Sequence, residues 1–289
     1  MKEFFIGKTN NHRKREKGVL VYPVYSRRSG GLSVGINLFP GKKHCSFDCP
    51  YCELFPSSND YDDSEFSVEL MEDDLRQEVA AALERNIPVR DICFSGNGEP
   101  ALSPEFPEAL EMAGCVREEL VSGAELVLIT NGTGLLDERL FSLLAKAAFS
   151  FRLDIWLKLD AGTPFWYGKM NRSAVSFEKI IWKIKEFSAI APVTIQTMIC
   201  AVDGEGPPKE EAEAWEKLLA ELVLKGNDKK DSGIRKVQVY GKARPSPEDP
   251  KADALPEKHL EERAASLRAA LSAVSAAGKI NTPPVEVYP

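Results

Sequence analysis

Three of the six cysteines fall within one short segment, Cys45-Ser-Phe-Asp-Cys49-Pro-Tyr-Cys52. Thiolates are preferred ligands of zinc and of iron–sulfur clusters, and spacings this tight allow one loop to surround a single metal centre. A structural zinc site needs four ligands, whereas the other three cysteines are isolated in the sequence. The segment therefore predicts a cubane iron–sulfur cluster with one iron left for a ligand that is not protein. A zinc knuckle or a set of buried thiols is the alternative.

Polar residues also accompany two later apolar stretches. One stretch ends in Ser95-Gly96-Asn97-Gly98-Glu99-Pro100, where glycines let backbone approach a ligand closely, although the same pattern occurs in ordinary turns. Lys158 and Asp160 lie two residues apart and therefore on one face of a strand. Charged side chains inside a fold are costly unless they are paired or bind a ligand. These two residues are thus expected to form either a salt bridge or part of a binding site.

The elements that must position these residues follow a repeated pattern. From about residue 32 onward, short apolar stretches alternate with longer segments of helical periodicity, which is typical of six βα units and a parallel sheet. The predicted strands span residues 32–38, 91–95, 125–130, 155–160, 193–200 and 236–240. The predicted helices span residues 70–85, 104–120, 135–147, 177–187, 210–224 and 257–276.

Alternation within the strands indicates what the sheet encloses. In the first strand Leu32, Val34 and Ile36 share one face, and Ser33 and Gly35 share the other; five of the six strands have such a polar or small face. A barrel built only for stability would fill its interior with branched aliphatic residues. We therefore predict an α/β fold, a partial (βα)6 barrel of mostly parallel strands around a polar ligand. Residues 32–278 would form the barrel, residues 1–31 an N-terminal extension and residues 279–289 a C-terminal tail.

Composition and net charge indicate the cellular compartment and the classes of partner to expect. The chain has 289 residues, 43% of them hydrophobic, and no apolar run long enough to span a membrane, so we expect a cytoplasmic protein without membrane contact. The formal net charge of −7 disfavours nucleic acid as a partner but does not exclude it. The basic run at residues 12–17 is interpreted as a solvated tail, and the acidic segment 53–66 as an exposed lid or insertion.

The cysteine spacing, the aromatic residue before the third cysteine and the position of the loop after the first barrel strand together resemble the radical S-adenosylmethionine (SAM) superfamily. Within it, Ser26-Arg27-Arg28 ahead of the first strand resembles small iron–sulfur oxidoreductases related to the wyosine-tRNA enzymes, and the likeness covers residues 23–245. The resemblance implies a [4Fe–4S] cluster held by Cys45, Cys49 and Cys52. It also implies reductive cleavage of SAM to a 5′-deoxyadenosyl radical that removes a hydrogen atom from the substrate.

The same resemblance assigns the SAM contacts. It places Tyr51 near the adenine, and it likens Gly96, Asn97, Gly98 and Glu99 to the family element that contacts the amino group of SAM, with Glu99 alternatively structuring the loop. Lys158 would bind the carboxylate and Asp160 the ribose. The fifth strand lacks the glycine of the family's adenine element. The remaining candidates at the strand ends are Thr130, Asn131, Gln196 and Met198.

Substrate candidates are mostly cationic, and arginine recognises carboxylates and phosphates in bidentate fashion. We therefore expect an anionic small molecule or peptide as substrate, unless these residues close the barrel edge or face solvent. The resemblance further implies an electron donor such as flavodoxin or ferredoxin. A tRNA-modifying enzyme of the wyosine type, a glycyl-radical-enzyme activase and a non-catalytic iron–sulfur or zinc module remain alternatives. The candidate residues are Arg27, Arg28, Arg172, Tyr240 and Arg244, with Lys242 and Asn171 beside them.

Overall fold

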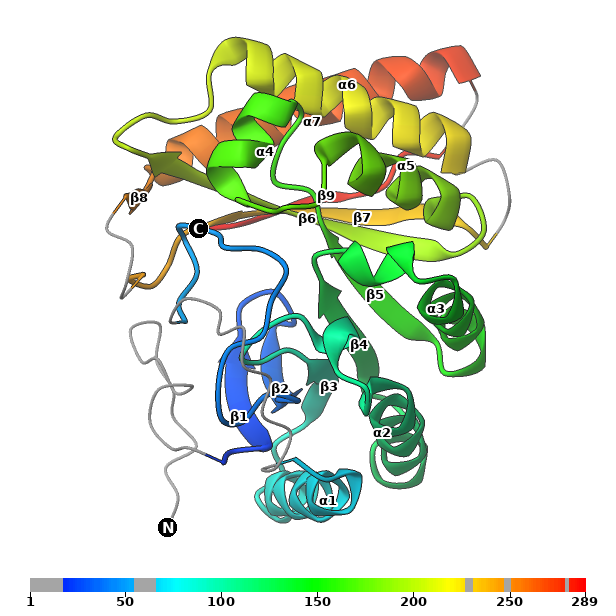
Figure 1. The fold of residues 1–289 in the computed structure, drawn as a ribbon. Helices are drawn as coiled ribbons and strands as arrows, with labels where there is room; N and C mark the ends of the chain where they lie inside the picture. Colours follow the sequence, from blue (N-terminus) through cyan, green and yellow to red (C-terminus); the bar gives the residue numbers. More distant parts are fainter. Residues whose placement is uncertain (1–17, 55–65, 227–230, 247–250, 279–280) are drawn as a thin grey trace.

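A single curled sheet organises the molecule, with most helices on its convex side (Figure 1). This computed structural model describes residues 18–54, 66–226, 231–246, 251–278 and 281–289. The strand order is β1-β2-β3-β4-β5-β6-β7-β9; β1 runs antiparallel to β2, the following pairs are parallel, and β8 pairs antiparallel with β6. The strands are β1 (Val21–Ser26), β2 (Gly31–Ile36), β3 (Val89–Phe94), β4 (Glu125–Thr130), β5 (Leu153–Lys158), β6 (Pro192–Val202), β7 (Gly233–Gly241), β8 (Ala252–Ala254) and β9 (Val285–Tyr288).

The helices pack their apolar faces onto the outer side of this sheet. Leu32, Val34 and Ile36 of β2 are almost completely buried, as are Met71 and Leu75 on the first helix. Burial of apolar surface between helices and strands is the main stabilising contribution in such a fold. The helices are α1 (Val68–Glu84), α2 (Phe106–Leu120), α3 (Glu138–Ser150), α4 (Pro164–Met170), α5 (Phe177–Ser188), α6 (Lys209–Gly226) and α7 (Glu257–Gly278), with 3₁₀ turns at Pro100–Leu102 and Thr133–Leu136.

The predicted fold class is confirmed, because the six expected strands correspond to β2 through β7 and lie parallel in one half-barrel sheet. The prediction of one helix over residues 135–147 is wrong at its start. There the chain first forms a 3₁₀ turn, and α3 begins only after Asp137, whose Oδ1 accepts hydrogen bonds from the backbone N–H groups of Arg139 and Leu140. A side-chain cap of this kind fixes where a helix begins.

Two edge strands come from segments expected to flank the barrel. Strand β1 lies within the predicted extension and β9 within the predicted tail. The Tyr288 hydroxyl of β9 lies 3.3 Å from the carbonyl oxygen of Arg28, in the turn between β1 and β2, and 2.6 Å from Glu286 Oε2. The two ends of the sheet therefore approach each other at this point. The basic run 12–17 and residues 55–65 of the predicted lid lie outside the described residues.

No helix in the described part of the chain is long and apolar enough to cross a membrane.

We predict that Tyr288→Phe lowers the free energy of unfolding by about 1 kcal/mol, the usual contribution of one hydrogen bond. The phenyl ring would stay in place while the contact between the two sheet edges is lost. Urea denaturation followed by circular dichroism measures the effect. An unchanged midpoint and slope would show that this hydroxyl does not stabilise the closure of the sheet.

Candidate functional site

The cysteine loop follows β2 and is held by backbone contacts to the loop that follows β3. The His44 N–H donates to the Asn97 carbonyl at 3.0 Å, and the Glu99 N–H donates to the His44 carbonyl at 2.8 Å. Gly98 adopts a φ of +150°, and a Cβ at this position would overlap the His44 carbonyl. The glycine therefore permits the close approach of two protein loops, which differs from the ligand approach that its position in the sequence suggested.

Asn37, at the end of β2, ties the same two loops together. Its Oδ1 accepts a hydrogen bond from the Asn97 N–H at 2.9 Å, and its side chain lies against Gly96, where any Cβ would collide with it. The Asn97 side chain turns towards the cysteine loop and donates to the Phe39 carbonyl at 3.1 Å. Asn97 is thus used inside the protein, whereas Gly96 and Gly98 border a cavity.

Glu99 connects the loop after β3 with the end of β4. Its Oε1 accepts from the Thr130 hydroxyl at 2.6 Å and from the Ala101 N–H at 3.2 Å, and its Oε2 accepts from the Asn131 N–H at 2.7 Å. Burial raises the pKa of Glu99 to about 7, against the lowering effect of these hydrogen bonds. Of the two roles expected for Glu99, its hydrogen bonds match the structuring of the loop.

Two asparagines direct N–H groups at cysteine sulfurs. Asn131 Nδ2 lies 3.7 Å from Cys45 Sγ and donates to the Ser46 hydroxyl at 2.9 Å. Asn171 Nδ2, in the loop after α4, lies 3.8 Å from Cys49 Sγ and 3.0 Å from Asp160 Oδ2. Hydrogen bonds to sulfur are one means by which a protein adjusts an iron–sulfur centre.

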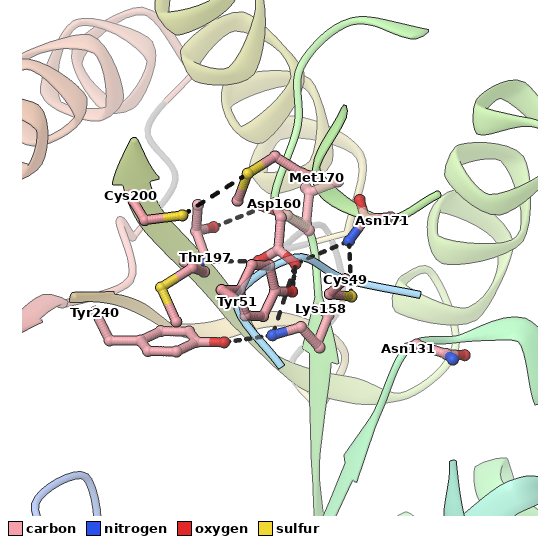
Figure 2. Close-up of polar contacts among 12 residues, drawn as sticks. Cys49, Tyr51, Asn131, Lys158, Asp160, Met170, Asn171, Thr197, Cys200 and Tyr240 are labelled. Carbon is pink, nitrogen blue, oxygen red and sulfur yellow. Dashed lines mark hydrogen bonds and ion pairs between the residues drawn. The ribbon is translucent and has the colours of Figure 1, made fainter. Parts of the chain in front are cut away.

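The buried carboxylate of Asp160 is the centre of a polar network (Figure 2). Its Oδ2 accepts from the Tyr51 hydroxyl and lies 3.6 Å from Lys158 Nζ, and its Oδ1 accepts from the Met198 N–H at 2.8 Å. Lys158 lies between the rings of Tyr51 and Tyr240, at 4.9 and 5.0 Å, and donates to the Tyr240 hydroxyl. Although burial opposes it, the charge of Asp160 raises the pKa of Lys158 above its ordinary value. The salt bridge considered from the sequence is therefore present.

The three cysteines border one cavity, which we call the cysteine cavity. Most of the residues predicted to contact SAM also border this cavity, whereas Asn97 and Asp160 do not. Gln196 Oε1 is buried and has no hydrogen-bond partner among the described residues, and Gln196 also borders the cavity. The bordering candidates are Cys45, Cys49, Tyr51, Cys52, Gly96, Gly98, Glu99, Thr130, Asn131, Lys158, Gln196 and Met198.

Lys43 is a cavity residue that the sequence analysis missed. Its side chain is only 8% exposed although it is a lysine, and it borders the cavity beside the cysteines. Burial opposes its charge, but the three cysteines, with a hydrogen bond to Cys52, raise the pKa of Lys43. A lysine two residues before a cysteine motif is a weak signal, because the adjacent Lys42 is exposed.

Burial disfavours ionisation of two of the three thiols. Burial raises the pKa of Cys45 to about 12 and that of Cys49 to about 11. Among the described residues, no group of three or more Cys, His, Asp or Glu side chains is arranged as a ready metal site. No disulfide joins any of the six cysteines. Because a bound metal ion deprotonates its thiol ligands, three thiols on one cavity wall fit a soft metal centre chemically.

The substrate candidates gather in a second cavity, which we call the lumen cavity, inside the curled sheet. Arg27, Arg28, Tyr240, Lys242 and Arg244 border it. It shares Tyr51, Met198, Tyr240 and other residues with the cysteine cavity, so the two adjoin. Arg172, with a φ of +46°, borders neither cavity.

Comparisons with known proteins agree with this geometry. The family model described as the radical SAM superfamily matches residues 42–218, more than half of the chain. The chain belongs to the radical SAM superfamily. A UPF0026 protein of Helicobacter pylori (strain J99) is 29% identical over 126 residues, which cover 42% of this chain and 37% of that protein. The chain thus matches well under half of this relative's length.

Solved radical SAM structures share the fold. A radical SAM methyltransferase from Sphaerobacter thermophilus superposes with a TM-score of 0.59 at 15% identity, covering 92% of this chain and 68% of the other. Streptococcus suis SuiB bound to the precursor peptide SuiA gives 0.59 at 14% identity, covering 90% and 50%. At such identities the likeness establishes the radical SAM partial barrel, while membership of the superfamily supports SAM-dependent radical chemistry in general.

We predict that Gly98→Ala destabilises the radical SAM domain by at least about 1–3 kcal/mol, because the new Cβ must separate the two loops that meet at His44. Chemical denaturation measures the loss. Gly123→Ala is the matched control, since nothing lies within 4 Å of a Cβ at this exposed position. Equal stability of the two variants would contradict the tight junction described here.

Proposed function

We propose that this chain is a radical SAM enzyme that holds a [4Fe–4S] cluster through Cys45, Cys49 and Cys52. The observation that carries the proposal is that the three cysteines and most of the candidate SAM contacts border one cavity, which adjoins a second cavity inside the sheet. When bound, the cluster and SAM supply one-electron cleavage to a 5′-deoxyadenosyl radical, which takes a hydrogen atom from the substrate. The protein's part is to position these groups and to exclude water.

The residues around the thiols suit a cluster. Asn131 and Asn171 present N–H groups to two of the sulfurs, and Lys43 presents a buried positive charge. A [4Fe–4S] cluster with three thiolates carries net negative charge, which a neighbouring cation offsets. We assign Lys43 the role of stabilising this charge.

The SAM side of the cavity divides into binding and supporting residues. Lys158 is partly accessible and can pair with the SAM carboxylate, and the unpartnered Gln196 Oε1 can accept from the adenine amino group. Asp160 is completely buried, and its oxygens already contact Tyr51, Asn171, Lys158 and Met198 N–H. We therefore assign Asp160 to positioning Tyr51 and Lys158 in place of the expected ribose contact.

The substrate would occupy the lumen cavity next to SAM. Its cationic border favours an anionic small molecule or the acidic part of a peptide. SuiB, a structural neighbour, was crystallised with a precursor peptide, which supports including peptides among the candidates. An external one-electron donor such as flavodoxin or ferredoxin completes the proposed reaction. Wyosine-type tRNA modification and activation of a glycyl-radical enzyme would be separated from this proposal by product analysis.

The combined variant Cys45→Ala, Cys49→Ala and Cys52→Ala should fail to bind iron and sulfide after anaerobic reconstitution, because no other described cysteine borders the cysteine cavity. It should also yield no 5′-deoxyadenosine with SAM and dithionite. Metal analysis and chromatography measure the two results. Cys115→Ala, which removes an exposed cysteine, should behave as wild type. A combined variant that retains iron and sulfide would refute the ligand assignment, and a wild-type protein that binds iron without cleaving SAM would indicate a non-catalytic module.

Lys43→Met should shift the reduction potential of the reconstituted cluster to more negative values, because removal of a buried cation destabilises the reduced, more negative state. An electron paramagnetic resonance titration measures the potential directly. Lys42→Met is the matched control, since the adjacent lysine is exposed and its loss should leave the potential almost unchanged. Equal potentials in both variants would remove Lys43 from the cluster's surroundings.

A further inference from the structure

We infer that the lumen cavity binds a small amphipathic anion, with its carboxylate or phosphate on Arg28 and its apolar body against Cys93, Ile129 and Trp156. The inference rests on the proposed function in one respect, namely that the anion bound in the lumen cavity is the substrate of the enzyme. It specifies the substrate class and the orientation of the substrate relative to the cysteine cavity.

Unbalanced positive charge is the first observation. Four cationic side chains and one acidic side chain, Glu53, border the lumen cavity among its described residues. Glu53 already pairs with Arg244 at 2.8 Å. No carboxylate of the described chain lies within ion-pair distance of Arg28. Burial, together with repulsion from Arg28 and Arg244, lowers the pKa of Arg27. A bound anion would relieve this repulsion.

Arg28 is also held in place before any ligand binds. Its guanidinium lies over the rings of Trp156 at 5.5 Å and Tyr240 at 5.1 Å, which orients its planar group. Its backbone carbonyl contacts Tyr288 from the opposite edge of the sheet. The nearby Asp91 accepts a hydrogen bond from Ser33; burial raises the pKa of Asp91, while this hydrogen bond and the charge of Arg28 act to lower it. Arg28 is therefore a preorganised anion receptor.

The apolar part of the ligand has its own surface. Cys93, Val127 and Trp156 form a small apolar cluster on the inner side of β3, β4 and β5, separate from the main core, with Ile129 packed against it. The indole N–H of Trp156 is used by Asp154 at 2.8 Å, so the ring presents a hydrocarbon surface. The cavity volume of about 130 Å³ is near that of cavities that hold benzene. A ring or a short branched chain fits this space.

The order of residues along β5 gives the ligand a direction. Trp156 and Lys158 lie two residues apart on one face of β5, so about 7 Å along the strand separates them. The Arg28 guanidinium lies over the Trp156 ring, and Lys158 lies against Tyr51 of the cysteine motif. Arg28 borders both cavities, so the anionic group would lie where they adjoin, with the apolar body below it at the level of Trp156. The hydrogen atom to be removed would therefore belong to a carbon near the charged end of the substrate.

Calorimetric titration of the reconstituted 289-residue chain tests the inference with benzoate, phenyl phosphate, neutral benzamide and inorganic phosphate as probes. We expect benzoate or phenyl phosphate to bind at least tenfold more tightly than both benzamide and inorganic phosphate. Arg28→Gln should weaken that binding at least tenfold, and Arg28→Lys should weaken it less, because lysine keeps the charge but loses the planar group. Arg90→Gln is the matched control, an exposed arginine near the start of β3 that borders neither cavity.

Four results would overturn the inference. They are equal binding of benzamide and benzoate, equal binding of inorganic phosphate and phenyl phosphate, unchanged affinity in a folded Arg28→Gln variant, and loss of probe binding at saturating SAM. The last result would mean that Arg28 belongs to the SAM site. Failure of the proposed function is recognised separately, because the combined cysteine variant should still bind the probes even though it cleaves no SAM.

Discussion

The buried carboxylate of Asp160 is the constraint on which the site depends. A charge without access to water must be compensated by the protein, and Asp160 obtains this from Tyr51 on the cysteine loop, Lys158 at the end of β5, the Met198 N–H on β6 and Asn171 after α4. Three regions of the chain, at Tyr51, at residues 158–171 and at Met198, therefore have to meet around one group. The position of the cysteine loop relative to the sheet follows from that requirement.

The other contacts of the cysteine loop have the same character. Gly98 and Glu99 join it to the loop after β3, and Asn131 joins it to the end of β4. Many polar groups at the carboxyl ends of the strands thus hold one another, and we propose that Lys158 and Gln196, which border the cysteine cavity, are among those left to bind a ligand. These hydrogen bonds between loops hold the ligand-binding side chains in more precise positions than isolated loops would.

Residue patterns were sufficient for the parallel strands, because alternation reports directly which face of a strand is buried. The cysteine motif was sufficient to predict the superfamily, and the substrate candidates Arg28, Tyr240 and Arg244 border one cavity. Residue patterns could not distinguish Asp160 as a support from Asp160 as a ligand contact, since that depends on how many partners surround a carboxylate after folding. Residue patterns also could not predict the burial of Lys43 or the pairing of β9, because both depend on contacts between segments distant in the sequence.

The contact between Tyr288 and Arg28 joins residues 260 positions apart. Pairings of such long sequence separation carry a large loop-closure entropy and form late in folding. The hairpin of β1 and β2 that carries Arg28 is local and can form without this contact. The consequence is that the Arg28 turn is tied to the opposite edge of the sheet only when the C-terminal strand β9 has docked.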